Sequence, residues 1–414
     1  MDIGRWLTAK RLRAHGLFLG LVLWSLYVWT IATPGLRDRN GNLKGTDFLH
    51  FYTLGSLAIE RRGADLYDID KQAALAGQRV PAAAGIRYLP LYPPQVSLLF
   101  APFAYLSYPW ALALWWLCTT AIYAICCYAI WRSCPHLAQH RLTVAILAAG
   151  FPGFFNLIAW GQTSAVALAC FTILFFLMRQ NRHLLAGLVL GCLIFKPQLG
   201  LAAGILFVLL GAWKMVIGAT VSAAVQLSIG VLYYGIAPLR TWFSMLWNLP
   251  ALSTLLEPKP YQTHCLRTFW SMLIPWSSLS TALYLVSAAV VMTWTILTWK
   301  RSQDWALRLS SLLLASVLIA PHLTVYDLLI LAPAFLLLSD WAVGLSQTSN
   351  TSFIGTMLYL AYILPLTGPL LRGTHVQLSV VAMSILVYLV MKSTKSDWVG
   401  RPIEAQPPRQ VTAI

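Results

Sequence analysis

The sequence predicts an all-α fold, a polytopic transmembrane helix bundle. Hydrophobic residues make up 58% of the 414 residues and charged residues only 10%, a balance that a soluble domain of this length does not sustain. Apolar stretches recur from residue 16 to residue 391, interrupted by glycine, proline and short basic clusters. We therefore expect one multi-span membrane domain over residues 1–391, followed by a flexible cytoplasmic tail over residues 392–414.

Basic residues predict the topology of the bundle. The net charge is +16, and lysines and arginines gather before the first apolar stretch, in the short gaps between later ones and in the tail. If residues 16–33 cross outward, these clusters fall on the cytoplasmic side and both termini are cytoplasmic. No basic face with interleaved aromatic residues lies outside the apolar stretches, so nucleic acid is not expected as a partner. The predicted location is the cell membrane, which in a bacterium is the inner membrane.

Individual spans follow from this topology. We expect roughly 12 crossings with both ends inside. The expected spans are residues 16–33, 110–131, 142–159, 163–178, 184–195, 199–212, 215–235, 277–299, 309–320, 323–338, 353–371 and 376–391. Several are shorter than the ~20 residues that a straight crossing needs, and we interpret these as broken or re-entrant helices.

Two long segments, residues 34–92 and 236–276, lie between spans on the non-cytoplasmic face. The first has apolar residues at helical spacing, which predicts an interfacial helix along the membrane surface. Thr46 is a candidate cap of that helix, and Asp47 falls in its first turn, where the helix dipole favours an ionised carboxylate. Asp47 is therefore a candidate functional group; the alternative is that it only marks a helix start.

A lysine interrupts two apolar stretches in Phe195-Lys196-Pro197-Gln198. An ammonium next to hydrocarbon costs about 2.5–3.5 kcal/mol and persists with an anionic partner, so we expect Lys196 to meet a ligand or a carboxylate. Pro197 supports a helix break that frees backbone groups in a cavity. The alternative is that Lys196 snorkels to the interface.

Further polar residues fall on the same predicted side. Gln162 and Gln198 are candidates for binding hydroxyl groups, with packing between helices as the alternative. His322 and Arg267 are candidates for contacting a phosphate. Asp327 has two possible partners, Lys196 and Arg267, and in either case needs no chemical role of its own. The candidate residues in this set are Tyr92, Gln162, Gln198, Arg267, His322 and Tyr326.

In chain order, these motifs resemble a known family. They are Thr46-Asp47-Phe48 with Tyr52, Tyr92-Pro93-Pro94, Gly161-Gln162, Lys196-Pro197-Gln198 and Pro321-His322. Together they resemble glycosyltransferase family 87, the polyprenyl-phosphate-mannose-dependent mannosyltransferases of the GT-C superfamily, over about residues 16–340. The resemblance implies a bundle of GT-C type, a polyprenyl-phosphate sugar donor, an active site open to the periplasm or exterior, and a base that corresponds to Asp47.

The expected reaction is direct displacement at the anomeric carbon of a hexose, with mannose the first expectation. Asp47 takes the proton of a hydroxyl on a lipid-linked or glycan acceptor, and the configuration inverts. Lys196, Arg267 and His322 are the candidates for the departing phosphate. Tyr52, Tyr92, Gln162, Gln198 and Tyr326 are candidates for substrate binding. No metal or other cofactor is expected, because Asp47 is solitary and the cysteines form no zinc pattern.

Two rival functions use the same features. A polytopic transporter or flippase of a lipid-linked or anionic substrate also suits broken helices and an intramembrane lysine, but such proteins usually show related halves, and this sequence shows no repeat. In a membrane scaffold without catalytic activity, the polar motifs have no chemical role.

Overall fold

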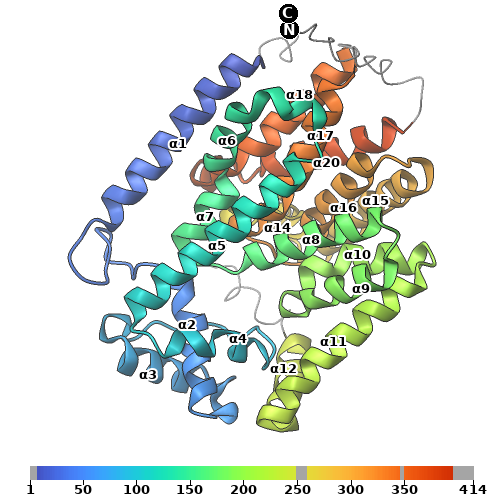
Figure 1. The fold of residues 1–414 in the computed structure, drawn as a ribbon. Helices are drawn as coiled ribbons and strands as arrows, with labels where there is room; N and C mark the ends of the chain where they lie inside the picture. Colours follow the sequence, from blue (N-terminus) through green and yellow to red (C-terminus); the bar gives the residue numbers. More distant parts are fainter. Residues whose placement is uncertain (1–6, 249–258, 346–348, 395–414) are drawn as a thin grey trace, which may run out of the picture.

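The computed structural model describes residues 7–248, 259–345 and 349–394. This part of the chain is mostly helical, with connecting turns and loops and two isolated β-bridges (Figure 1). The predicted all-α fold class is confirmed. The helices are α1 (Ala9–Ile31), α2 (Thr46–Ile59), α3 (Ile69–Arg79), α4 (Val96–Ala104), α5 (Tyr108–Trp131), α6 (Arg141–Ala149), α7 (Pro152–Trp160), α8 (Ser164–Arg179), α9 (His183–Gly191), α10 (Pro197–Leu209), α11 (Trp213–Tyr234), α12 (Ile236–Asn248), α14 (Leu266–Leu273), α15 (Ser277–Arg301), α16 (Trp305–Leu318), α17 (Ala332–Val343), α18 (Ser349–Ile363), α19 (Leu371–Thr374) and α20 (Leu378–Lys392). Two of the 3₁₀ segments between them contribute to the site, η5 (Cys192–Phe195) and η8 (Val325–Leu331).

The helices have the length and composition of a membrane bundle. Among the described residues, six helical segments are long and apolar enough to cross a membrane, or up to seven if one bent pair counts as a single span. Further apolar helices of 10–17 residues accompany them. The polytopic helical bundle is thus confirmed. The predicted number of roughly 12 crossings is reached only if the short helices cross as well.

Broken helices occur where the sequence predicts short spans. The expected span 142–159 is a pair of helical segments, Pro135–Ala149 and Pro152–Trp160, bent by 41° at the break. Pro152 occupies the first turn of α7, where the missing N–H is tolerated. In the same way, α9 with η5 and then α10 replace the expected spans 184–195 and 199–212, and the break between them falls at Lys196.

The first outer segment folds into the helices α2, α3 and α4. Helix α2 begins at Thr46 as expected, but Thr46 does not cap it. The cap position is Gly45, and the Thr46 hydroxyl instead donates to the Leu43 carbonyl at 2.7 Å. Every residue from Phe48 to Ala58 is buried within the protein. The expected position of α2 along the membrane surface stays a prediction.

The second outer segment packs against the first. The described parts of residues 236–276 contain α12 and α14, and residues 249–258 lie outside the described chain. Trp242 of α12 donates its indole N–H to the Leu91 carbonyl at 2.9 Å. The His264 N–H donates to the Leu323 carbonyl at 3.1 Å, which ties this segment to the chain just before η8. These two contacts bring three distant parts of the chain to one region.

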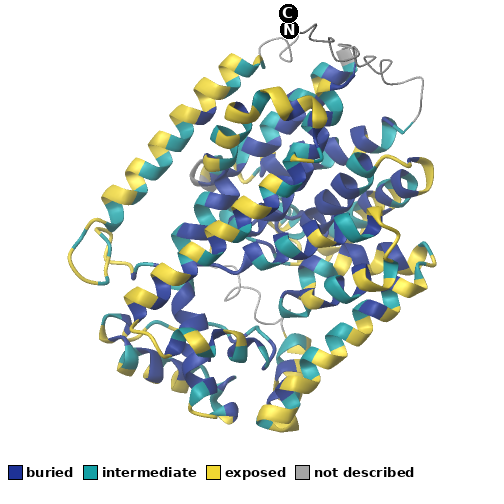
Figure 2. Cartoon of the chain, viewed as in Figure 1, coloured by how far each residue is buried: buried dark blue, intermediate teal, exposed yellow. Residues whose placement is uncertain are grey.

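The hydrophobic core is centred on α16. Every residue from Leu309 to Leu318 of α16 is buried, and α8, α10 and η8 pack around this helix. By contrast, Gly16 is the one buried residue of α1, and the outer faces of α1 and α11 are exposed (Figure 2). Helices that are buried all round stand inside a bundle, and those with exposed apolar faces meet lipid.

Two predictions about organisation stay predictions. The single membrane domain over residues 1–391 is one, and the flexible cytoplasmic tail over residues 392–414 is the other. Of that tail, residues 395–414 lie outside the described chain.

Candidate active site

Asp47 lies at a sharp turn into α2. Gly45 has a left-handed φ of 64°, and a Cβ at this position would come within 2.4 Å of Leu112, so both the turn and the packing require glycine. Tyr108 donates its hydroxyl to the Gly45 carbonyl at 2.9 Å, and Tyr88 donates to the carbonyl of the residue directly before Asp47. The backbone that carries this carboxylate is therefore held from two sides.

Gln162 reaches Asp47 from the turn between α7 and α8. Gly161 ends α7 with a φ of 72°, and a Cβ there would come within 2.7 Å of Phe48, the residue after Asp47. Trp115 donates its indole N–H to the Gly161 carbonyl at 3.1 Å. This close approach allows the Gln162 side-chain nitrogen to donate to Asp47 Oδ2 at 2.7 Å.

Lys196 lies at the break between η5 and α10 and is only 4% exposed. Its ammonium donates to Asp327 Oδ1 at 2.7 Å, to Ser164 Oγ at 3.3 Å and to Gln162 Oε1 at 3.3 Å. Pro197 begins α10, which is why the lysine backbone leaves the helical path here. Lys196 therefore has a carboxylate partner and does not snorkel, and of the two partners that the sequence left open for Asp327, the partner is Lys196.

These side chains border one cavity of about 610 Å³. Its lining residues are Asp47, His50, Phe51, Arg87, Tyr88, Leu89, Leu91, Tyr92, Trp160, Gln162, Phe195, Lys196, Pro197, Gln198, Leu201, Leu246, Lys259, Gln262, Thr263, Pro321, His322, Thr324, Val325, Tyr326 and Asp327. All the site residues predicted from the sequence line it, except Tyr52 and Arg267. Segments separated by up to 280 positions, from Asp47 to Asp327, thus meet at one place.

Tyr52 and Arg267 lie outside the cavity wall. Tyr52 is 3% exposed, and its hydroxyl donates to the Leu106 carbonyl at 2.8 Å, so it belongs to the packed interior of the first outer segment. Arg267 donates from Nε to the Pro321 carbonyl. Pro321 and the following His322 both line the cavity, so this bond holds a part of the backbone that forms the cavity wall.

The cavity contains residues that the sequence analysis did not identify. Arg87 and Lys259 bring two cationic side chains to its wall; Arg87 pairs with Asp70 at 2.9 Å, and Lys259 lies 5.7 Å from the Trp160 ring centroid. His50 is 4% exposed, and neither ring nitrogen has a hydrogen-bond partner. It lies three residues after Asp47 on α2 and thus shares its face of the helix, a spacing that the sequence does show.

The acid–base properties of the cavity wall follow from burial. Burial raises the pKa of the Asp47 carboxyl to about 6, against the opposing effects of the Gln162 hydrogen bond and the Lys196 charge. Asp47 is thus still ionised at neutral pH, as the sequence predicts, but it is a stronger proton acceptor than an exposed aspartate. Burial also lowers the pKa of His50 to about 4, so that imidazole is neutral.

The chemistry available to the site is proton acceptance and anion binding. Asp47 and Asp327 each already accept a hydrogen bond from a nitrogen of the protein. Among the residues that the structure describes, no group of three or more His, Cys, Asp or Glu side chains is arranged to hold a metal ion.

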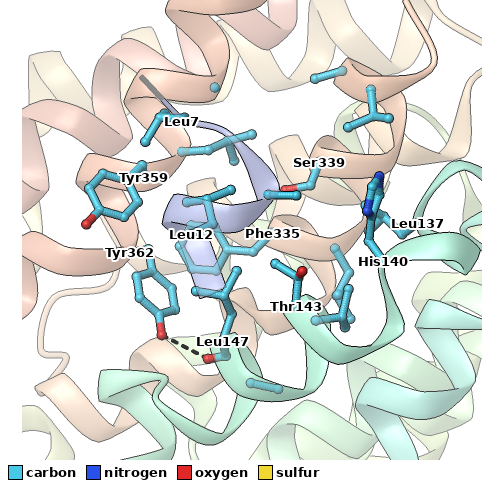
Figure 3. Close-up of a pocket in the computed structure, with 18 of the residues that line it drawn as sticks. Leu7, Leu12, Leu137, His140, Thr143, Leu147, Phe335, Ser339, Tyr359 and Tyr362 are labelled. Atoms are coloured by element: carbon cyan, nitrogen blue, oxygen red, sulfur yellow. Dashed lines mark hydrogen bonds between the residues drawn. The ribbon is translucent and has the colours of Figure 1, made fainter. Parts of the chain in front are cut away.

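A second cavity, of about 340 Å³, lies near the start of α1 (Figure 3). It is lined by α1, α5, α6, α17 and α18, and its labelled residues include Leu12, Phe335 and Tyr362. The Tyr362 hydroxyl donates to the Leu147 carbonyl at 2.8 Å. No Asp, Glu, Lys or Arg lines this cavity within the described chain, so it offers volume without charged groups.

The fold defines a polytopic membrane protein with a charged cavity among broken helices. The family model of glycosyltransferase family 87 matches residues 91–321, more than half of the chain. The chain belongs to glycosyltransferase family 87 and is a membrane glycosyltransferase. The matched segment contains Gln162 and Lys196, whereas Asp47 precedes it. No curated protein and no solved structure matches the chain.

Proposed function

We propose that this glycosyltransferase moves a hexose, in the first instance mannose, from a polyprenyl-phosphate donor to a hydroxyl group of a lipid-linked or glycan acceptor. One observation carries the proposal. Asp47 is a carboxylate whose pKa is raised to about 6, and it lines a cavity of about 610 Å³ that cationic side chains also line. A proton acceptor and a phosphate-binding region in one cavity are what transfer from a sugar phosphate to an alcohol requires.

The proposed step is a single displacement. Asp47 takes the proton of the acceptor hydroxyl, the acceptor oxygen forms a bond to the anomeric carbon, and the bond from that carbon to the phosphate oxygen breaks. The bonding electrons leave with the phosphate, so the polyprenyl phosphate departs as an anion. Because attack and departure are on opposite faces of the sugar, the configuration at the anomeric carbon inverts.

Charge on the departing phosphate needs cationic or hydrogen-bonding partners. Lys259, Arg87 and His322 all line the cavity, and we assign them to the phosphate. Arg267 acts behind His322 through its bond to the Pro321 carbonyl. A monophosphate carries less charge than a nucleotide diphosphate, so these groups suffice in the proposal without a metal ion.

The remaining lining residues are assigned to the sugar and the acceptor. Tyr92, Gln198 and Tyr326 line the cavity. Aromatic rings pack against the apolar faces of sugars, and amides bind their hydroxyl groups. We assign these three residues to substrate binding.

The setting of the reaction is also a proposal. In a bacterial inner membrane, with both chain termini in the cytoplasm, the Asp47 cavity faces the periplasm or exterior. Support comes from α1, which begins at the end of the molecule opposite α2, α3 and α4 (Figure 1), and from the basic clusters that mark the cytoplasmic side. Membership in a glycosyltransferase family favours transfer over the transporter and scaffold alternatives.

The test is a direct transfer assay. Purified protein is incubated with labelled polyprenyl-phosphate sugars and an extract of envelope glycolipids, and the products are analysed for acceptor, linkage and anomeric configuration. We expect labelled product from the mannose donor, with the configuration inverted relative to the donor. Transfer from a nucleotide sugar and none from any polyprenyl-phosphate sugar contradicts the proposal, as does retention of configuration.

A further inference from the structure

The amide of Gln162 has one orientation in this structure, and neighbouring groups explain it. Its oxygen accepts from the Lys196 ammonium at 3.3 Å and from the Thr163 N–H at 3.3 Å. An ammonium has donors only, so the amide oxygen must face it. The amide nitrogen is then left for Asp47 Oδ2, 2.7 Å away.

Lys196 has no free donor for a ligand. An ammonium group has three N–H donors. Its three acceptors are Asp327 Oδ1, Gln162 Oε1 and Ser164 Oγ, and Ser164 in turn donates to the same Asp327 oxygen. The side chains of Lys196 and Asp327 are 4% and 3% exposed. A phosphate that bound Lys196 would have to displace one of these partners.

We propose that Lys196 is a positioning residue that acts on the base through Gln162, together with Ser164 and Asp327, and is not a ligand of the donor phosphate. Lys196 fixes the Gln162 amide, and that amide holds Oδ2 of Asp47, which leaves Oδ1 for the acceptor proton. Asp327 and Ser164 fix Lys196. This inference rests on the proposed function and changes the role that the sequence suggested for Lys196.

The charges around Asp47 are consistent with Lys196 and Asp327 acting together as a pair. Gln162 and Lys196 lower the pKa of the Asp47 carboxyl, Asp327 raises it, and Lys259, which also lines the cavity, lowers it. Tyr88, Tyr92, Tyr108 and Tyr326 are the further titratable groups close enough for their charge to interact with that of Asp47. Because Lys196 and Asp327 act in opposite directions, the pair orients Gln162 while adding little net charge beneath the base.

The decisive variants remove either the Lys196–Asp327 ion pair or the Gln162 amide that the pair orients. Lys196→Met combined with Asp327→Leu deletes both charges and keeps the volume, and Gln162→Met deletes the amide. For each we expect kcat to fall at least about tenfold with the donor KM within about twofold. Combining all three changes should be no worse than the pair alone, because they break one chain of contacts. Lys259→Met is the matched control, for which the donor KM should rise instead.

Other results overturn the inference. A donor KM raised tenfold by the pair variant, with kcat unchanged, assigns Lys196 to the phosphate. Additive losses from the pair variant and Gln162→Met show that Lys196 does not act through the amide. If the pair variant does not fold, Ser164→Ala keeps both charges and frees one donor of Lys196. A lower kcat at constant KM then supports the inference, and a change in KM alone contradicts it.

A readout without turnover separates this inference from the proposed function. The Asp47 carboxyl band, identified by its loss in Asp47→Asn, is titrated by infrared difference spectroscopy in the full-length protein. Gln162→Met and the pair variant should each raise the midpoint, because both remove the oriented donor from Oδ2. If the wild type transfers no sugar, the proposed function fails while this titration still decides the role of Lys196. An unchanged midpoint in the pair variant contradicts that role.

Discussion

Two cavities in the described part of the chain differ in how the chain builds them. The Asp47 cavity, of about 610 Å³, is lined by turns, helix starts and the break at Lys196. The cavity near Leu12, of about 340 Å³, is lined largely by helix faces with apolar side chains. Buried charges gather in the first, where broken helices supply polar groups and partners, and are absent from the described lining of the second. Chemistry in this bundle is therefore expected where helices are interrupted.

Of all changes to residues that line either cavity, removal of the base should cause the largest loss of transfer activity. Asp47→Asn keeps the size of the side chain but cannot accept the proton, so we expect transfer to fall by about 10²- to 10⁴-fold with donor binding retained. The control is Asp68→Asn, which caps α3 in the same outer segment and lies outside the cavity lining; asparagine caps a helix equally well. Equal losses in the two variants would remove Asp47 as the base.

Breaking the buried ion pair should cost stability. Asp327→Ala leaves Lys196 uncompensated at 4% exposure, for which we expect a loss of about 3–5 kcal/mol in the free energy of unfolding. The pair variant Lys196→Met with Asp327→Leu should recover most of that loss, because neither charge is then buried alone. Thermal unfolding in detergent measures both. A pair variant less stable than Asp327→Ala would show that the ion pair itself stabilises the fold.

The close approach at Gly161 can be separated from its backbone strain. Gly161→Ala adds a Cβ at a φ of 72° and within 2.7 Å of Phe48, whereas Gly41→Ala has a similar φ of 78° with nothing within 4 Å. Gly41→Ala should lose about 1–2 kcal/mol of stability from the backbone strain alone, and Gly161→Ala should lose more, because Phe48 must also shift. We expect only Gly161→Ala to reduce kcat, by about tenfold, since it displaces the Gln162 turn from Asp47. Equal kcat values would mean that this contact does not position the amide.

Changes in the second cavity should have the smallest effect. Ser339 lines this cavity and is absent from the lining of the Asp47 cavity. We expect Ser339→Ala to leave both kcat and the donor KM within about twofold of the wild type in the transfer assay. A tenfold change in either parameter would give this cavity a part in the reaction.

The difference between the two cavities also explains which site residues the sequence predicts. Gly161-Gln162 and Lys196-Pro197 are visible because a glycine or a proline interrupts an apolar stretch, and both motifs line the charged cavity. The all-α bundle follows from composition, but the number of crossings does not, because short helices do not reveal whether they span the bilayer. The apolar cavity cannot be predicted from the sequence, because the apolar residues that line it do not differ from those on an ordinary packed helix face.

Physical reasons explain why one predicted residue lies outside the cavity lining and why several lining residues were not predicted. Tyr52 is part of the motif around Asp47, yet five positions after Asp47 on a helix it points away, whereas His50 at three positions shares the face of Asp47. Arg87 and Lys259 belong to irregular segments where spacing carries no information. The sequence alone does not identify the partner of Lys196, because Asp327 lies 131 positions away and only the fold brings the two together.

The pH dependence of kcat/KM tests the central claim most directly. Asp47 accepts a proton only when it is ionised, and burial raises the pKa of its carboxyl to about 6. Activity should therefore be constant at higher pH and fall about tenfold per pH unit below that value, with this acidic limb absent from the residual activity of Asp47→Asn. A wild-type profile that is flat from about pH 5 to about pH 8, or an acidic limb that persists in Asp47→Asn, would contradict the assignment of Asp47 as the base.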